Sequence, residues 1–406
     1  MVPEGWIITQ LSELADIKRG AGSQYLTYVE APDDGIRLIR ISDFLGDSKK
    51  YVLHTSAIDR FILRKDDILI AGTGATAGII FRVPDEYSGL PFSYNAPRIR
   101  PKTTSCSGYL YYFLCSDTII RQQHALFTGN AQPFLDTRAI GGFKVLAPPV
   151  LEQKRIAQIL STWDQAITAT ERLLKNSQQR KKGLMQQLLT GKKRLLSCDG
   201  EPFSDNWEVK KISQISSRIQ RKTDGGKHPI LTISSRSGFV KQEDKYSRYM
   251  AGESVKNYIL LERGEFAYNK GNSKTYEFGC VFDLEQFDRG LVPHVYVCFK
   301  LNAGMSHRYF KYLFEADYLK PQLGSLVNTG VRNNGLLNIK PSEFLSTTVP
   351  VPCIEEQERV ADVLYSSSAE IEALSRRLNC LRKEKKALMQ QLLTGKRRVN
   401  VETEAA

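Results

Sequence analysis

The chain contains one long internal repeat. Residues 145–195 align without a gap to residues 349–399 at a constant offset of 204 positions, and 23 of the 51 aligned positions are identical. The nine residues Leu184–Lys192 (LMQQLLTGK) recur unchanged as Leu388–Lys396. A period of roughly 200 residues is much longer than the period of about 20–50 residues that solenoid proteins have. The repeat indicates instead that a domain and its following helix are duplicated, so the protein should present two similar surfaces to its partners.

Each copy of the repeat has the pattern of one long helix. Apolar residues recur every three or four positions, which is the heptad spacing of a coiled-coil seam. Within each copy, prolines precede the start of the expected helix and Gly191 or Gly395 marks its end, so both ends carry stop signals. Each helix could therefore run for about 40 residues, or roughly 60 Å. The predicted seam consists of Ile156, Leu160, Trp163, Ile167, Leu174, Leu184 and Leu188 in the first copy, and of Val360, Leu364, Ile371, Leu374, Leu378, Leu381, Leu388 and Leu392 in the second.

Two matched seams in one chain favour pairing of the two helices in an intramolecular coiled coil. Because a full domain separates them, either direction is open, and the duplication favours an antiparallel pair. The alternative is that each helix packs only on its own domain.

The segments outside the helices are weakly similar to each other. Trp6 matches Trp207, and the aromatic stretch at 109–114 matches the one at 309–314. Alternating stretches such as Ile36–Ile41 predict short strands. We therefore expect an α+β protein in which two similar α/β domains are separated by two long antiparallel coiled-coil helices, with an internal pseudo-twofold duplication. The expected parts are a first domain at 1–147, a first helix at 148–197, a second domain at 198–351, and a second helix with the C-terminal tail at 352–406.

Composition favours a soluble basic protein. The chain has 57 Lys and Arg against 44 Asp and Glu, a net charge of +13, which indicates a polyanionic partner or an anionic surface. Its seven cysteines form no CxxC pair, which favours scattered reduced thiols over a disulfide framework or a zinc site. No signal peptide opens the chain, and no run approaches the roughly 18 apolar residues of a membrane span. We therefore expect a cytoplasmic location.

No stretch of the sequence has a self-contained catalytic pattern. The glycine-rich segment Gly72–Gly78 lacks the Lys-Ser/Thr of a phosphate-binding loop, and the residues Ile79–Val83 predict a second strand instead of a helix. A glycine-rich hairpin is therefore the better interpretation. The five histidines do not have metal-binding spacing, and no adenine-methylase or nuclease motif is present. We expect no catalytic residue, no metal ligand and no cofactor in this chain.

Basic and amide side chains nevertheless gather in predicted loops, interleaved with aromatic and small residues. Arg and Lys suit phosphates and guanine edges, whereas Asn and Gln suit adenine edges, so these residues are candidates for DNA contacts. Any one of them could also be an ordinary solvated loop residue. In the first domain the candidates are Arg37, Arg40, Ser42, Tyr94, Asn95, Arg98, Asn130 and Gln132. In the second they are Arg218, Arg221, Lys222, Arg236, Asn269, Lys270, Asn272, Lys274, Arg332, Asn333 and Asn334.

Taken together, these motifs resemble the specificity subunit of type I restriction–modification enzymes. The likeness rests on Gly5-Trp6, on the segment Asp66–Gly78, on the Pro…Glu-Gln…Arg openings of both helices, and on the two LMQQLLTGK ends. It spans essentially the whole chain in the doubled order of domain, helix, domain, helix.

The resemblance implies a non-catalytic, DNA-binding subunit of a phage-defence system. Each of two target-recognition domains would read one half of a split double-stranded DNA site. Two modification subunits, which bind S-adenosylmethionine, would dock along the helices and methylate an adenine in each half. Restriction subunits, which use ATP and Mg²⁺ for translocation and cleavage, would complete the enzyme.

Two other classes of protein remain open at this point. A single-chain DNA methylase or nuclease should bind S-adenosylmethionine or cut DNA alone. A coiled-coil scaffold with a basic surface should bind acidic proteins and give no sequence-selective footprint on DNA.

The seam leads to a first prediction. An Ile371→Asp substitution would bury a carboxylate against apolar neighbours, at a cost on the order of several kcal/mol. We expect aggregation, or loss of assembly with the methylase, in size-exclusion chromatography of the coexpressed proteins. Normal complex formation by this variant would contradict the pairing of the two seams.

Overall fold

The protein divides into two compact units, each of which combines helices and strands. The first unit contains residues 1–172 and 376–406, and the second contains residues 173–375. The α+β class expected from the sequence is therefore confirmed. The computed structural model describes residues 2–30, 34–46, 49–127, 133–245, 253–271, 273–327 and 337–400.

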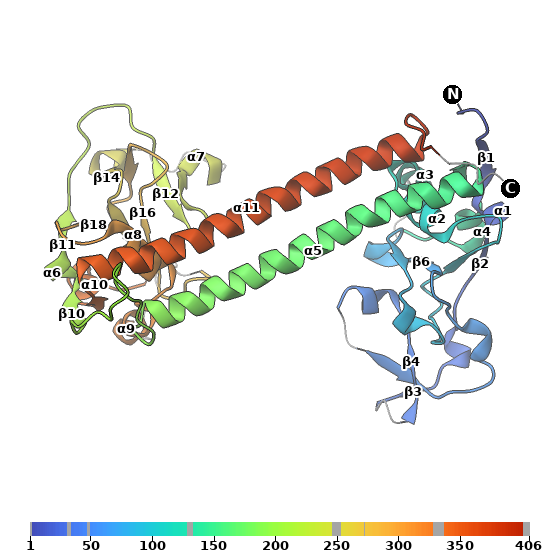
Figure 1. The fold of residues 1–406 in the computed structure, drawn as a ribbon, viewed down its shortest axis with the longest axis horizontal. Helices are drawn as coiled ribbons and strands as arrows, with labels where there is room; N and C mark the ends of the chain where they lie inside the picture. Colours follow the sequence, from blue (N-terminus) through green and yellow to red (C-terminus); the bar gives the residue numbers. More distant parts are fainter. Residues whose placement is uncertain are drawn as a thin grey trace. The chain divides into compact units, whose positions relative to one another are not determined.

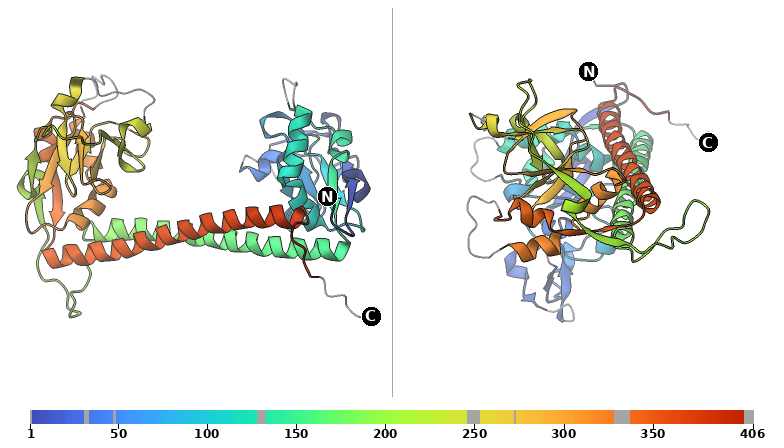
Figure 2. Two further views of the ribbon diagram at one scale, coloured as in Figure 1. Left: turned by 90° about the horizontal axis from the view of Figure 1, so that it is seen from above. Right: turned by 90° about the vertical axis from the view of Figure 1, so that its left-hand side faces the viewer.

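The two long helices form as predicted. Helix α5 spans Val150–Leu188 and helix α11 spans Ile354–Leu393, which are 39 and 40 residues. The boundary between the units falls inside both helices, so each unit holds a segment of each. In both units the two segments lie side by side (Figures 1 and 2). None of the helices in the described part of the chain has the length and apolarity that a membrane crossing requires.

Within each unit the helix segments run antiparallel. In the first unit, Asp164 pairs with Lys385 while Glu171, further along α5, pairs with Arg382, which is earlier in α11. In the second unit, the Ser177 hydroxyl donates to Glu370, 3.0 Å away. The end of α5 in that unit shares a core with the start of α11.

All 15 seam residues predicted above are buried or partly buried in the structure. Away from their first turns, the helices also bury the polar residues Thr170, Ser177 and Ser367. The Thr170 and Ser367 hydroxyls donate to backbone carbonyls one turn earlier, which satisfies them without a partner across the seam.

Each unit contains a four-stranded antiparallel sheet, and the strand order is equivalent in the two. The first sheet has the order β2-β8-β6-β7, and the second has the order β11-β18-β15-β16. The strands of the first are Ala15–Lys18, Arg98–Pro101, Ile68–Ile70 and Ile80–Arg82. The strands of the second are Ser216–Ile219, Val297–Leu301, Phe266–Asn269 and Cys280–Asp283.

In each unit a two-stranded ribbon leads into the start of one long helix. It pairs β1 (Ile7–Gln10) with β9 (Lys144–Ala147) in the first unit, and β10 (Glu208–Lys211) with β19 (Thr348–Val351) in the second. β9 is followed directly by α5, and β19 by α11.

The remaining strands differ between the units. The first has a three-stranded sheet of β3 (Tyr28–Val29), β5 (Lys50–Val52) and β4 (Ile36–Leu38). The second has two strand pairs. They join β12 (Leu231–Ser234) to β13 (Gly238–Lys241) and β14 (Ile259–Glu262) to β17 (Arg289–Val292).

Of two strands expected from the sequence, one is shorter than predicted and the other is present. The strand expected at Ile36–Ile41 ends early, because Ile39 pairs separately with Phe92 and a 3-10 turn begins at Ile41. The strand expected after Gly78 is present as β7, which forms a hairpin with β6.

Short helices cover the sheets. The first unit has α1 (Leu11–Leu14), α2 (Ser107–Leu114), α3 (Asp117–Phe127) and α4 (Thr137–Gly141). The second has α6 (Ile212–Ile215), α7 (Gln242–Lys245), α8 (His307–Glu315), α9 (Lys320–Leu326) and α10 (Pro341–Leu345).

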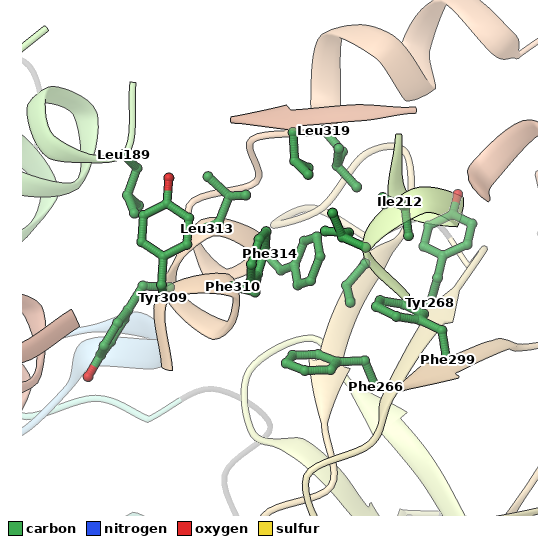
Figure 3. Close-up of a cluster of buried hydrophobic side chains, with 14 of the residues drawn as sticks. Leu189, Ile212, Phe266, Tyr268, Phe299, Tyr309, Phe310, Leu313, Phe314 and Leu319 are labelled. Atoms are coloured by element: carbon green, nitrogen blue, oxygen red, sulfur yellow. The ribbon is translucent and has the colours of Figure 1, made fainter. Parts of the chain in front are cut away.

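Aromatic side chains form much of the core of the second unit. Figure 3 shows Tyr309 and Phe310 of α8 near Leu189, with Phe266, Tyr268 and Phe299 coming from the sheet. The rings of Phe266 and Phe299 stack with centroids 5.5 Å apart. The Phe314 ring of α8 lies edge-on to both, with its centroid 5.5 Å from that of Phe266 and 5.9 Å from that of Phe299. Such pairs add to the free energy gained by burying apolar area, and they hold α8 on the sheet.

The start of each long helix carries a buried carboxylate. Glu356 is 0% exposed and accepts a hydrogen bond of 2.8 Å from the Trp207 indole and two from the Arg194 guanidinium, at 2.9 and 2.6 Å. In the first unit, Glu152 accepts from Trp6 at 3.0 Å and from Arg398 at 2.8 and 2.9 Å. Each carboxylate thus joins the start of one helix to the segment that follows the end of the other. We call these two clusters the Glu–Trp–Arg anchors.

The second anchor leads to a stability prediction. A Glu356→Ala substitution leaves a guanidinium and an indole N–H without their acceptor, which should cost about 2–3 kcal/mol because Arg194 is partly solvated. Urea unfolding followed by circular dichroism measures this cost. Glu358, two residues further along α11, forms an exposed pair with Arg308, so Glu358→Ala should cost about 1 kcal/mol or less. Equal costs for the two variants would contradict the role of the anchor.

Candidate nucleic-acid interface

Three loops of the first unit converge beside its four-stranded sheet. Residues 19–22 follow β2, residues 71–77 follow β6, and residues 92–96 lead into β8. The Ala21 amide donates to the Phe92 carbonyl at 2.8 Å, and the Tyr94 amide donates to the Ala21 carbonyl at 2.9 Å. The Gly72 amide donates to the Asn95 carbonyl at 3.0 Å. These backbone bonds fix the candidates Tyr94 and Asn95 against the glycine-rich loop, and both residues are exposed.

A fourth segment, residues 133–135, joins the same cluster. The Leu135 amide donates to the Gly72 carbonyl at 2.8 Å, and Thr73 pairs with Phe134. The candidates Asn130 and Gln132 come just before this segment, and they lie outside the described residues.

Arg37 and Arg40 are held by a carboxylate at the end of β4. The Arg37 guanidinium donates to Asp43 at 2.9 Å and lies over the Tyr87 ring, 4.8 Å from its centroid. The Arg40 side chain also donates to Asp43, at 3.3 Å. Ser42 lies in the 3-10 turn Ile41–Phe44, just before Asp43, and is partly buried. The two arginines therefore help to fix this turn.

Arg98 is part of the sheet and not of a loop. It lies on β8, is 3% exposed, and its Nη2 donates to Asp16. Burial in the sheet lowers the pKa of the Arg98 guanidinium. Its position favours a role in holding β8 to β2 over a contact with DNA.

The candidates of the second unit fall into three groups. Arg218 lies on β11 and is exposed, and Arg236 is exposed in the turn between β12 and β13. Arg221 donates to the buried Glu265 at 2.7 Å, and Lys222 donates to the Asn257 carbonyl at 3.0 Å, so both serve the local framework.

The third group is the loop after β15. Asn269 accepts from the Gly271 amide at 3.0 Å, which sets the direction of the loop. The Lys270 ammonium donates to the Ile339 carbonyl at 3.2 Å, and the Lys270 carbonyl accepts from the Leu337 amide at 3.0 Å. Lys274 is exposed. The candidates Asn272, Arg332, Asn333 and Asn334 lie outside the described residues.

The loops after β6 and β15 are thus held in the same way. In each unit the backbone amide of a leucine, Leu135 or Leu337, donates to a carbonyl of the loop that follows the third strand in the order of the sheet, β6 or β15. The framework of hydrogen bonds is shared, while the side chains that it displays differ.

Sequence reasoning missed one residue at the centre of the first cluster. The Arg19 guanidinium lies over two aromatic rings, 4.4 Å from the Tyr94 centroid and 4.9 Å from the Phe134 centroid. We call these three residues the Arg19 stack. The available signal was an arginine followed directly by glycine, but a contact with Phe134, which is 115 positions later in the chain, cannot be deduced from the local sequence.

The described residues contain no cluster of three or more His, Cys, Asp or Glu side chains that could hold a metal ion. The chemistry that the clusters do offer is recognition: guanidinium and ammonium donors, amide groups and exposed rings on loops fixed by backbone hydrogen bonds.

The comparison with known families decides the identity of the first part of the chain. The family described as "Type I restriction modification DNA specificity domain" matches residues 3–177. Residues 3–177 are a type I specificity domain. This domain begins just before β1, includes the three segments that contribute the Arg19 stack, and ends within α5. The resemblance predicted from the sequence motifs is therefore confirmed.

Whole-chain relatives are consistent with the specificity domain. The chain is 25% identical to the specificity subunit of the type I restriction enzyme MjaVIII of Methanocaldococcus jannaschii, covering 98% of this chain and 94% of that protein. It is 22% identical to the specificity subunit of the EcoKI enzyme of Escherichia coli, covering 93% and 85%. The crystal structure of a type I S subunit from M. genitalium has a TM-score of 0.55 at 13% identity, covering 98% and 96%, which shows a shared fold.

Proposed function

We propose that this chain is the non-catalytic specificity subunit of a type I restriction–modification complex and reads a bipartite sequence in double-stranded DNA. The observation that carries the proposal is the doubled framework, in which sheets of equivalent strand order display different side chains. The match of residues 3–177 to a type I DNA specificity domain connects this framework with DNA recognition. One framework with two sets of loops suits the reading of two unlike half-sites.

In this proposal, residues 1–147 and 198–351 are the two target-recognition domains. Exposed cations such as Arg218, Arg236 and Lys274 contact phosphates, which supplies affinity and sets the register on the duplex. The exposed Tyr94 and Asn95 meet base edges, and so do the candidates in the undescribed segments at 128–132 and 328–336.

Residues 148–197 and 352–406 are proposed to bind the partner subunits. The end of each helix carries the same LMQQLLTGK sequence, so two copies of one modification subunit can use equivalent surfaces. Those subunits would supply S-adenosylmethionine and methylate one adenine in each half-site. Restriction subunits would supply ATP-dependent translocation and Mg²⁺-dependent cleavage, and the complex would act in the cytoplasm, where its DNA targets are found.

Methylome sequencing of cells that carry this gene with its partner methylase tests the proposal. The expected result is a methylated motif with two defined halves and an undefined spacer. A single uninterrupted motif, or none, would overturn the proposal.

A domain exchange gives the next prediction. Replacing residues 198–351 with the corresponding segment of a relative should change one half of the methylated motif and leave the other half intact, because the two sheets and their loops are built independently. Methylome sequencing reads the outcome. A change in both halves would contradict independent reading by the two domains.

Phosphate contacts have a separate signature. A Lys274→Gln substitution should weaken binding to all DNA sequences alike and lower the slope of log affinity against log salt by about one, because one fewer counterion is released. Arg263 is the matched control, since it pairs with Asp288 just before β15 begins, whereas Lys274 follows its end. Arg263→Gln should leave the slope unchanged. Equal slopes for both variants and the parent complex would contradict this assignment of Lys274.

A further inference from the structure

The Arg19 stack exposes apolar surface in an otherwise polar group of loops. Tyr94 is 47% exposed and Phe134 is 48% exposed. Both rings lie within 5 Å of one guanidinium carbon, and such cation–π contacts hold the planar group in a fixed orientation. Exposing two rings to water around a fixed arginine costs free energy unless another molecule covers them.

The guanidinium itself has spare hydrogen-bond donors. Its Nη1 is buried without any hydrogen-bond partner, and its Nη2 reaches the Leu135 carbonyl only at 3.5 Å, which is the limit of a hydrogen bond. A buried donor left unpaired costs stability, so its presence calls for an explanation. Arg19 as a whole is partly exposed, and an arginine fork binds a ligand with two adjacent acceptors in a bidentate way.

The backbone around Arg19 holds the stack in place. A Cβ atom at Gly20 would lie only 2.2 Å from the Phe92 carbonyl oxygen, so the loop after β2 and the loop before β8 touch backbone to backbone. The Ala21 and Tyr94 hydrogen bonds described above lock the same contact. The guanidinium is therefore presented by a preorganised loop, which lowers the ordering cost of binding.

The second unit places a different residue at the same point of its framework. Arg19 is the first residue after β2, and Gln220 is the first residue after β11. The two strands pair in equivalent registers, β2 with β8 and β11 with β18. Gln220 is exposed. Arginine reads the O6 and N7 acceptors of guanine, whereas glutamine reads the N6 and N7 groups of adenine.

We propose that Arg19 determines specificity by reading a guanine in the half-site bound by the first unit, with Tyr94 and Phe134 orienting its guanidinium. This inference rests on the proposed function. It names one residue and one base, neither of which follows from a role in DNA binding alone.

The test is an Arg19→Gln substitution in the complex with the partner methylase. The domain exchange above first identifies the half-site that the first unit reads. Binding is then measured, for each G·C pair of that half-site in turn, to two DNA duplexes that differ only by a G·C or an A·T pair at that place. One of these places is the one that Arg19 reads. The preference for G·C over A·T should fall about ten- to hundredfold, and the other half-site should be unaffected. Since the ratio compares two duplexes with one protein preparation, partial unfolding of the variant does not change it.

Lys18→Gln is the matched control. It removes the same charge one residue earlier, from a side chain that is 63% exposed and beside Asp16. This variant should keep the full preference for G·C. If Lys18→Gln and Arg19→Gln reduce the preference alike, general charge and not base reading is responsible, and the proposal is wrong.

A second measurement uses the unaltered protein. Replacing the guanine with 7-deazaguanine removes the N7 acceptor, and binding should weaken about tenfold. Full binding to this duplex, or a first half-site that contains no G·C pair, would overturn the assignment of Arg19. Absence of any bipartite motif from the parent complex would instead overturn the proposed function.

Discussion

The rest of the structure depends on two buried carboxylates, Glu152 and Glu356. Removing a carboxylate from water is costly unless charged and neutral donors replace its hydration. Each receives an indole N–H from the start of its domain and a bidentate arginine from beyond the end of the other long helix. In each unit these hydrogen bonds hold together the start of the domain, the start of one long helix and the segment after the end of the other. The sheets and their loops are positioned relative to these two points.

The helices and strands that depend on neighbouring residues could be predicted from the local sequence pattern. The heptad spacing and the Pro and Gly signals predicted α5 and α11 closely, and the residues Ile79–Val83 predicted the strand after Gly78. Contacts between distant residues were not predictable in this way. Arg98 looked like a loop cation until the sheet placed it beside Asp16, and nothing near Arg19 in the sequence points to Phe134. Sequence patterns identify residue types, whereas partners depend on how the strands meet.

The two units also show which features the duplication has kept. A buried acid follows the turn before the central strand in both, Asp67 in one and Glu265 in the other, and each accepts a hydrogen bond from a backbone amide three residues earlier. The arginine that neutralises it differs, since Arg100 comes from β8 whereas Arg221 comes from the loop after β11. Both units thus keep a buried acid that is paired with an arginine, although the arginine comes from a different segment in each. The loops around the pair can therefore differ in sequence.

The first Glu–Trp–Arg anchor also determines the order in which the protein can be completed during synthesis. The second unit is one continuous segment of chain, but the first needs residues from both ends, with 246 positions between Glu152 and Arg398. At translation rates of about 5–20 residues per second, Glu152 waits on the order of 12–50 s for its arginine. During that interval its carboxylate and the apolar start of α5 are without their final partners. The domain made first is therefore the domain finished last.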